Sequence, residues 1–311
     1  MVEEEFAALI SRFPRSSAPW RLSAVPIIRR AAEIYRFSAA GARNDAAIKV
    51  FADPGDAKRF YMLLRKMYVR RTPVYQVPRP YGYAPPLRAV AMFWVKGDVL
   101  GDMLLAWRLD KKRRAALIAK SGGWLRWFHD GNLSERRAGD PSFFIGQIDR
   151  YRKTLLPAGL PAFFVRGYNA LTAAAPMIAD TQLEYGRPHG DFTPYNIFMH
   201  GSKAIGIDFQ SRARRPLVLD VCRMTVSLGL HRYWPTSRAA AEDTDCFIRA
   251  YGAGHLPEGA AFIWLQLAEA LRRWGSLAAR GKKRWRFRRW LERRRLQATV
   301  IRLTSALNAA A

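Results

Sequence analysis

A short segment past the middle of the chain combines residue types that bind metal ions and move protons. It contains His189, Asp191, Pro194 and Asn196, and Asp208 follows twelve residues after Asn196. Because proline cannot continue a regular helix, we expect Asp191 and Asn196 to lie on a loop. Two carboxylates and an amide supply the oxygen ligands that a hard divalent cation such as Mg²⁺ prefers. One carboxylate would remain to accept the proton of a hydroxyl group.

Two short strands are predicted directly after this loop. Residues 197–199 and 204–207 are mainly apolar, and Gly201 between them favours a turn. A hairpin of these strands would bring Asp208 back to the end of the ribbon at which Asn196 lies. The segment therefore predicts metal-assisted chemistry on a hydroxyl group.

The order of these residues resembles the catalytic sequence of kinase-fold phosphoryl transfer. In this respect the chain resembles the aminoglycoside phosphotransferase and choline kinase-like superfamily, which includes bacterial sugar and lipopolysaccharide-core kinases. The resemblance is carried by His-Gly-Asp at 189–191, by Asn196 and by the later Ile-Asp-Phe at 207–209. The likeness follows the order of the parts along most of the chain and is sharpest over residues 187–223. It implies an α+β, bilobal protein kinase-like fold, with a small β-rich N-lobe and a larger, mainly helical C-lobe. The implied reaction is transfer of the γ-phosphoryl group of ATP, or of GTP, to an alcohol hydroxyl.

The resemblance also implies a role for each residue of the C-lobe motif. Asp191 would orient and deprotonate the acceptor hydroxyl, and His189 would brace the catalytic loop. Asn196 and Asp208 would hold the Mg²⁺ ions that bridge the nucleotide phosphates. Asp220 would fix the backbone of the catalytic loop.

In the N-lobe, the same resemblance points to residues that contact the nucleotide. Lys49 would contact the α- and β-phosphates, and Gly41 lies in the loop that would cover them. Residues 93–97 would form the hinge strand against which adenine packs.

Two of these residues have ordinary structural alternatives. A lysine in an edge strand commonly protects a sheet from aggregation, and Lys49 would fit that role. Asp220 precedes an apolar segment at 221–230 and would fit the N-cap of a helix there.

Local patterns predict two parts of different secondary structure. Runs of β-branched and aromatic residues at 34–37 and 47–51 predict a hairpin with a long loop over 38–45. Asp53 and Pro54 precede a periodic segment that predicts a helix over 57–71. Further along, the pattern predicts a strand over 89–95 and helices over 102–107 and 113–129. We expect an N-lobe over residues 1–96 and a C-lobe over residues 97–311.

The predicted helix over 57–71 lacks the glutamate that kinase-fold enzymes pair with the N-lobe lysine. Asp45, Asp53 and Asp56 are candidate replacements, and the phosphate-covering loop has Gly41 as its one glycine. Two hypotheses follow: an enzyme with a rearranged lysine site, and an inactive pseudokinase that docks on an anionic membrane or nucleic acid. The complete set of motif residues in the C-lobe favours the enzyme.

The net charge restricts the class of acceptor. The chain has 52 Lys and Arg residues against 25 Asp and Glu residues, a net charge of +27. Such a chain prefers anionic partners. Beyond the N-terminus, Glu242, Asp243 and Asp245 form the one tight acidic cluster, so an aminoglycoside-type antibiotic is disfavoured as acceptor. We expect an anionic sugar or glycolipid such as lipopolysaccharide core, by electrostatics and family analogy.

The C-terminal segment carries a large share of the positive charge. Residues 272–302 contain thirteen Lys and Arg residues and one acid, Glu292. On a helical wheel, apolar residues fall on two sides: Phe287, Trp290, Leu291, Ala298 and Ile301 on one, and Trp285, Leu296, Val300 and Leu303 on the other. Arg294 interrupts the first stripe. Three interpretations stay open: a packed helix with a basic face, a surface that docks on an anionic membrane or glycolipid, and a less favoured nucleic-acid surface.

Composition excludes several broad classes. Half of the residues are apolar and 13% are aromatic, which argues against disordered, collagenous and disulfide-scaffold proteins. Cys222 and Cys246 are expected to be reduced core residues. The acidic start at Met1–Glu5 is unlike a signal peptide, and no uncharged apolar run is long enough for a membrane span. We expect a cytoplasmic protein, with a peripheral position on the inner face of the membrane as an option.

Overall fold

The computed structural model describes residues 2–11, 19–23, 27–28, 32–40, 45–106, 109–209, 213–231, 237–279 and 287–310. Contacts divide the chain into two compact units. Unit 1 comprises Met1–Asp98 and Ile197–Arg212, and unit 2 comprises Val99–Asn196 and Ala213–Ala311. From the sequence we expect one boundary, after residue 96, which assigns residues 197–212 to the C-lobe. In the structure these residues belong to unit 1.

The residues from 197 to 212 belong to unit 1 because of strand pairing. β11 (Ile197–His200) and β12 (Lys203–Gly206) form the predicted antiparallel hairpin, with Ile197 opposite Gly206. β12 then pairs in parallel with β5 (Tyr75–Gln76), a long-range contact that local patterns do not reveal. The strand order of this sheet is β5-β12-β11-β8, with β8 at Asp98–Val99.

The larger sheet of unit 1 has the strand order β1-β3-β4-β7-β6, and β2 pairs with β3. Its strands are β1 (Arg21–Leu22), β2 (Ile27–Ile28), β3 (Ala32–Ser38), β4 (Ala46–Phe51), β6 (Pro80–Ala84) and β7 (Ala89–Phe93). The predicted hairpin is present as antiparallel β3 and β4, with Ile34 opposite Lys49. Gly41, which lies between these strands in the sequence, is outside the described residues.

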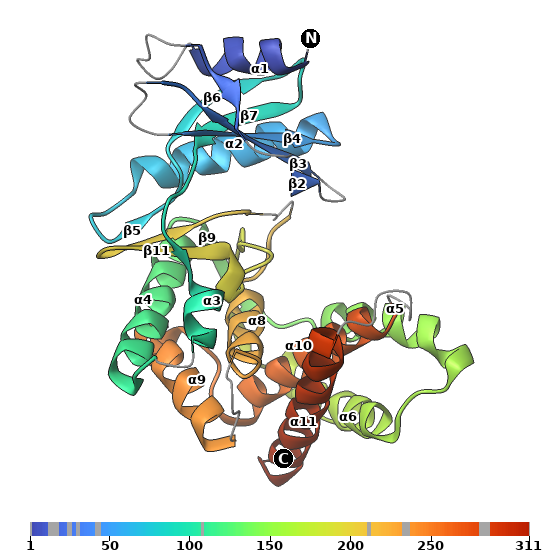
Figure 1. The fold of residues 1–311 in the computed structure, drawn as a ribbon. Coiled ribbons are helices and arrows are strands. Elements are labelled where there is room, and N and C mark those ends of the chain that lie inside the picture. The colour runs from blue at the N-terminus through green and yellow to red at the C-terminus, as the bar shows by residue number, and fades with distance from the viewer. Residues whose placement is uncertain are drawn as a thin grey trace. The chain divides into compact units, whose positions relative to one another are not determined.

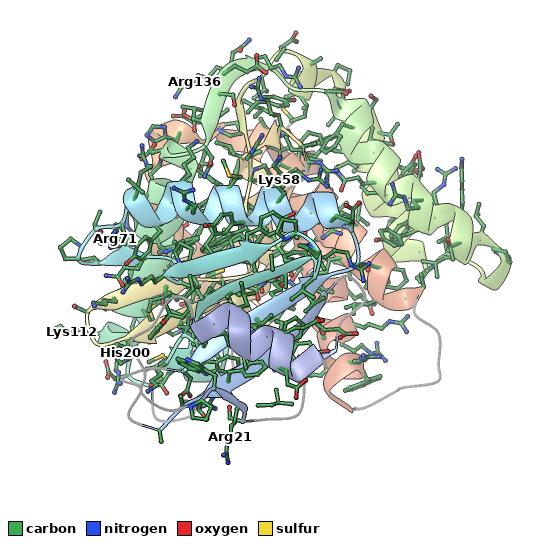
Figure 2. All side chains as sticks on the ribbon, turned by 90° about the horizontal axis from the view of Figure 1, so that it is seen from above. Arg21, Lys58, Arg71, Lys112, Arg136 and His200 are labelled. Atoms are coloured by element: carbon green, nitrogen blue, oxygen red, sulfur yellow. The ribbon has the colours of Figure 1, made fainter. Side chains whose placement is uncertain are left out.

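Alternation along β4 directs its side chains to two different helices. Ala46 and Ile48 join the core beneath α1 (Val2–Ser11), whereas Lys49 and Phe51 contact Phe60 of α2 (Pro54–Val69). In Figure 2 the strands run between α1 and α2, and Lys58 lies on α2. Asp53 caps α2 by accepting the backbone N–H groups of Gly55 and Asp56, so the helix begins at Pro54, three residues before the predicted range of 57–71.

Unit 2 is mainly helical and has its own apolar core. Its α-helices are α3 (Leu100–Leu105), α4 (Lys111–Asp130), α5 (Pro141–Leu155), α6 (Ala162–Ala173), α7 (Pro176–Ala179), α8 (Val218–Leu228), α9 (Ser237–Tyr251), α10 (Gly259–Ala278) and α11 (Phe287–Ala310). Short 3₁₀ turns are η1 (Leu156–Ala158), η2 (Pro194–Asn196) and η3 (Ala253–His255), and β9 (Leu133–Ala138), β10 (Gln182–Gly186) and β13 (Arg215–Pro216) form a small sheet. Buried side chains of α5, α6, α8, α10 and α11 share one core. The α+β class expected from the sequence is confirmed.

α10 and α11 lie side by side at the C-terminal end of unit 2 (Figure 1). One apolar stripe of α11 is buried, since Leu296, Val300 and Leu303 are at most 2% exposed. On the other stripe, Trp290 and Ile301 are 43% and 44% exposed. The helix is therefore packed through the stripe of Leu296, Val300 and Leu303. Residues 280–286 of the basic segment lie outside the described residues.

Both cysteines are free thiols, and burial raises the pKa of Cys222 well above its ordinary value. Among the described residues, no helix is both long and apolar enough to cross a membrane.

Candidate active site

Asp191 and Asn196 lie together on the loop predicted to carry them. The Asn196 Nδ2 donates to the Asp191 backbone oxygen at 2.7 Å and to its Oδ2 at 3.2 Å. Pro194 begins η2, and the Tyr195 ring packs against Gly101 of α3, where a Cβ would lie only 2.8 Å from it. The loop is thus fixed by a turn, by Asn196 and by a close contact with a helix.

His189 holds this loop from inside the core. It is fully buried among Trp124, Phe128 and Phe192, with ring centroids 5.4 to 6.0 Å from its own. Its Nδ1 accepts the Asp191 backbone N–H at 3.4 Å. The imidazole therefore fixes the backbone that carries the Asp191 carboxylate.

Asp220 binds the same loop from the first turn of α8. Its carboxylate accepts the backbone N–H groups of His189 at 2.5 Å and Gly190 at 3.0 Å, and it lies 3.1 Å from the His129 Nε2. The helix N-cap is Leu217, so the alternative reading of Asp220 as an N-cap is wrong.

The electrostatics keep Asp220 ionised at neutral pH. Burial alone would raise the pKa of this carboxyl, but hydrogen bonding and charge from His129, with smaller effects of His189 and Arg223, lower it below its ordinary value. An ionised carboxylate can accept both backbone N–H groups of the loop at once.

Arg223 and Glu269 also support the loop, and sequence reasoning missed both. Arg223 Nη1 donates to the Gly190 backbone oxygen, and its Nε lies 3.4 Å from Glu269. Arg272 donates twice to Glu269 at 2.6 Å. Burial alone would raise the pKa of Glu269, but the neighbouring arginines lower it to about 2. The sequence did hold a signal for Arg223: it follows Asp220 by three residues, a spacing that places two side chains on the same side of a helix.

Within unit 1, Lys49 and Asp208 form a direct ion pair. The Lys49 Nζ lies 4.8 Å from the ring centroid of Phe60 and 5.1 Å from that of Phe51, and Phe60 stacks on Phe209 at 5.7 Å. Asp208 has a left-handed backbone with φ of 62°, a conformation that costs energy and often occurs at functional sites. The strand order places Lys49 on β4, between β3 and β7, so the edge-strand alternative is wrong.

The three acids considered as partners of Lys49 bond elsewhere. Asp45 accepts from Arg36, with Nε at 2.9 Å, Asp53 caps α2, and Asp56 pairs with Arg59 at 2.6 Å. The partner of Lys49 in this structure is therefore Asp208, 159 residues further along the chain.

The structure thus gathers the expected site residues into two groups. His189, Asp191, Asn196 and Asp220 lie together in unit 2, and Lys49 and Asp208 in unit 1. The chain links the groups at the β11–β12 hairpin, whose open end lies one residue after Asn196 and two before Asp208. Of the expected residues, Gly41 is the one outside the described part.

Comparison with known families decides what this arrangement is. Residues 32–262 match the family described as the phosphotransferase enzyme family. This chain belongs to that family. Among curated proteins, no sequence matches this chain significantly.

Solved structures show that this phosphotransferase has the protein kinase-like fold of its relatives. A choline/ethanolamine kinase family protein from Mesorhizobium loti is 16% identical, with 99% of this chain and 100% of that chain covered and a TM-score of 0.63. A glucosamine kinase bound to glucosamine, ADP and inorganic phosphate is 19% identical, with 99% and 85% covered and a TM-score of 0.62. An amicoumacin kinase bound to AMP-PNP and Ca²⁺ is 11% identical, with 96% and 92% covered and a TM-score of 0.62.

These findings confirm three predictions from the sequence. The superfamily resemblance is confirmed, as is the fold that it implied. The enzyme class is also confirmed: the protein is a phosphotransferase.

Proposed function

We propose that this phosphotransferase moves the γ-phosphoryl group of ATP or GTP to a hydroxyl of an anionic sugar or glycolipid, such as lipopolysaccharide core. The observation that carries the phosphoryl-transfer chemistry is the braced loop. Its Asp191 carboxylate is oriented by Asn196 and His189, and its backbone is bound by Asp220. Such positioning, together with charge neutralisation, supplies most of the rate in phosphoryl transfer.

In the proposed reaction, each residue acts on its own part of the substrates. Asp191 orients the acceptor hydroxyl and takes its proton as the oxygen attacks the γ-phosphorus, and the nucleoside diphosphate leaves. Lys49 would exchange part of its contact with Asp208 for contacts with the nucleotide phosphates. Its buried setting on β4 supports this role, because a charge–phosphate interaction is stronger where water is excluded.

The residues present fit a divalent cation. Asn196 carries an amide oxygen besides the Nδ2 group that donates to Asp191, and Asp208 carries a carboxylate in unit 1. Among the described residues, no group of three or more His, Cys, Asp or Glu side chains could hold a metal ion. We propose that Asn196 and Asp208 bind Mg²⁺, which would neutralise charge on the nucleotide phosphates. The nucleotides and the Ca²⁺ in structures of related kinases support this assignment.

The charge of the chain supports an anionic acceptor. Two members of the acidic cluster at 242–245 are already paired with cations: Glu242 with Lys111 at 3.1 Å, and buried Asp243 with Arg114 at 2.8 Å. These pairs leave less free negative charge to attract a polycationic antibiotic. The net charge of +27 favours an anionic acceptor instead.

A direct test is phosphoryl transfer from labelled ATP or GTP with Mg²⁺ to a panel of acceptors. The panel should include lipopolysaccharide core and sugar phosphates, with glucosamine, choline and an aminoglycoside as neutral or cationic counterparts. We expect transfer to anionic acceptors that is lost in Asp191→Asn. Transfer to the cationic or neutral acceptors alone would contradict the proposed acceptor class and leave the kinase chemistry intact.

A further inference from the structure

α11 has a stripe of partly exposed side chains on the side opposite its buried stripe. Trp290, Arg294, Gln297 and Ile301 recur at helical spacing on the side away from the buried leucines. Trp290 and Ile301 leave 43% and 44% of their surface exposed, so this stripe offers apolar surface to a partner.

This stripe forms one wall of a groove of about 460 Å³ against the start of α6 and the end of α10. Its floor is aromatic: Trp274 is 4% exposed and packs edge-on against Phe163 at 5.1 Å. We call this feature the α6–α11 groove. It combines an apolar floor with an exposed rim at Trp290 and Ile301.

Three arginines line the α6–α11 groove, and no acidic residue does among the described residues that line it. Arg293 lies over the Trp274 ring at 5.3 Å, and Arg294 over the Trp290 ring at 5.6 Å. Arg166 and Arg294 are exposed, and neither makes an ion pair with a described carboxylate. Burial lowers the pKa of Arg293, so an anion in the groove would offset part of its lost hydration.

We infer that the α6–α11 groove docks the enzyme on an anionic membrane, with lipid phosphates on Arg166, Arg293 and Arg294 and with Trp290 and Ile301 in the interface. Tryptophan prefers the boundary between headgroups and acyl chains, and arginine binds phosphate through its planar fork. The combination fits a phospholipid surface better than nucleic acid, because Ile301 offers an aliphatic contact without a base-stacking face. This inference rests on the proposed function and deepens it, since a glycolipid acceptor is presented at a membrane. The experiment that tests the inference measures binding and needs no enzymatic turnover.

The test is co-flotation of the full chain with vesicles of phosphatidylglycerol and phosphatidylcholine, with pure phosphatidylcholine vesicles as reference. We expect binding to the anionic vesicles only. Each cation near an anionic surface contributes about 1 kcal/mol, so Arg166→Gln with Arg294→Gln should weaken binding about 30-fold. Arg166→Lys with Arg294→Lys should retain most of the binding, and Trp290→Ala should weaken it about tenfold.

A matched control removes two exposed cations outside the groove. Lys58→Gln with Lys112→Gln, at positions labelled in Figure 2, should weaken binding less than about threefold. An equal loss in this control would overturn the inference, because only net charge would then matter. Failure of the natural chain to bind anionic vesicles would also overturn it, as would groove-dependent binding to an oligonucleotide instead.

Two further readouts separate this inference from the proposed function. The groove variants should keep the melting temperature and the Mg²⁺-dependent nucleotide binding of the natural chain. If nucleotide binding fails in all of these proteins while flotation behaves as expected, the kinase assignment falls and the docking surface stands.

Discussion

At the level of single residues, the Lys49–Asp208 pair gives the lysine a counter-charge without a glutamate on the following helix. α2 contains no glutamate, and its first-turn acid, Asp56, pairs with Arg59. The lysine is 5% exposed and lies among phenylalanine rings, so it needs a counter-charge. Asp208 supplies that charge, and in the proposed function it would also hold the cation.

Lys49→Met should therefore impair nucleotide binding more than folding. The methionine keeps most of the packing against Phe60 but removes a charged donor, so nucleotide affinity should fall about 10- to 100-fold. Isothermal titration calorimetry with ATP and Mg²⁺ measures this directly. Lys58→Met, an exposed lysine on α2, should leave affinity unchanged; an equal effect there would remove Lys49 from the nucleotide site.

Asp220→Asn tests whether the buried aspartate positions the catalytic loop. An amide cannot accept both the His189 and Gly190 N–H groups, so we expect about 3 kcal/mol less stability and a fall in kcat with little change in nucleotide affinity. Denaturant unfolding and steady-state kinetics provide the two readouts. Asp243→Asn, another buried carboxylate of unit 2, should lose similar stability without the selective fall in kcat.

At the level of secondary structure, local patterns predicted the elements that carry the site better than the contacts between them. The loop at Pro194, the β11–β12 hairpin and the start of α2 follow from proline, turn and capping residues, which act over a few positions. Pairing of β12 with β5 and of Lys49 with Asp208 was missed, because each joins distant parts of the chain. The strand β10, which precedes the catalytic loop, was also missed, because its five residues show little alternation between buried and exposed positions.

The burial of α11 also depends on contacts between distant parts of the chain. The sequence revealed two apolar stripes, but only the tertiary contacts with α6 and α10 determine which stripe is buried. Leu303→Ala should therefore cost about 2–5 kcal/mol of stability by leaving a cavity. Ile301→Ala, two residues away on the exposed stripe, should cost less than about 1 kcal/mol. Chemical denaturation compares the two, and equal losses would contradict the assignment of faces.

At the level of the whole molecule, the excess of arginine determines how the buried acids respond to pH. Glu184 is bound by Arg126 at 2.7 Å, Arg136 at 2.9 Å and His255 at 2.9 Å. Burial alone would raise the pKa of Glu184, but these partners lower it from 4.5 to about 2. Glu269 has a pKa of about 2 for the same reason.

This charge distribution predicts a specific window of acid unfolding. Because the pKa of Glu184 is lower in the folded than in the unfolded state, its stabilisation is present above pH 4.5 and is lost as pH falls toward 2. Glu184→Gln should therefore be less stable than the natural chain at pH 7, with a difference that shrinks between pH 4.5 and 2. Denaturant unfolding at several pH values measures it, and a constant difference across this range would contradict the account.

We propose that Asp208, Asn196 and Lys49 each contribute to binding a nucleotide and its metal ion. The most direct measurement is calorimetric binding of ATP and GTP with and without Mg²⁺, comparing the natural chain with Asp208→Asn. Asp180→Asn, an exposed carboxylate of unit 2, is the control. We expect binding by the natural chain and the control that requires Mg²⁺, and loss of the Mg²⁺-dependent part in Asp208→Asn. Absence of binding by the natural chain at millimolar nucleotide and Mg²⁺, or binding unchanged in Asp208→Asn, would contradict the account.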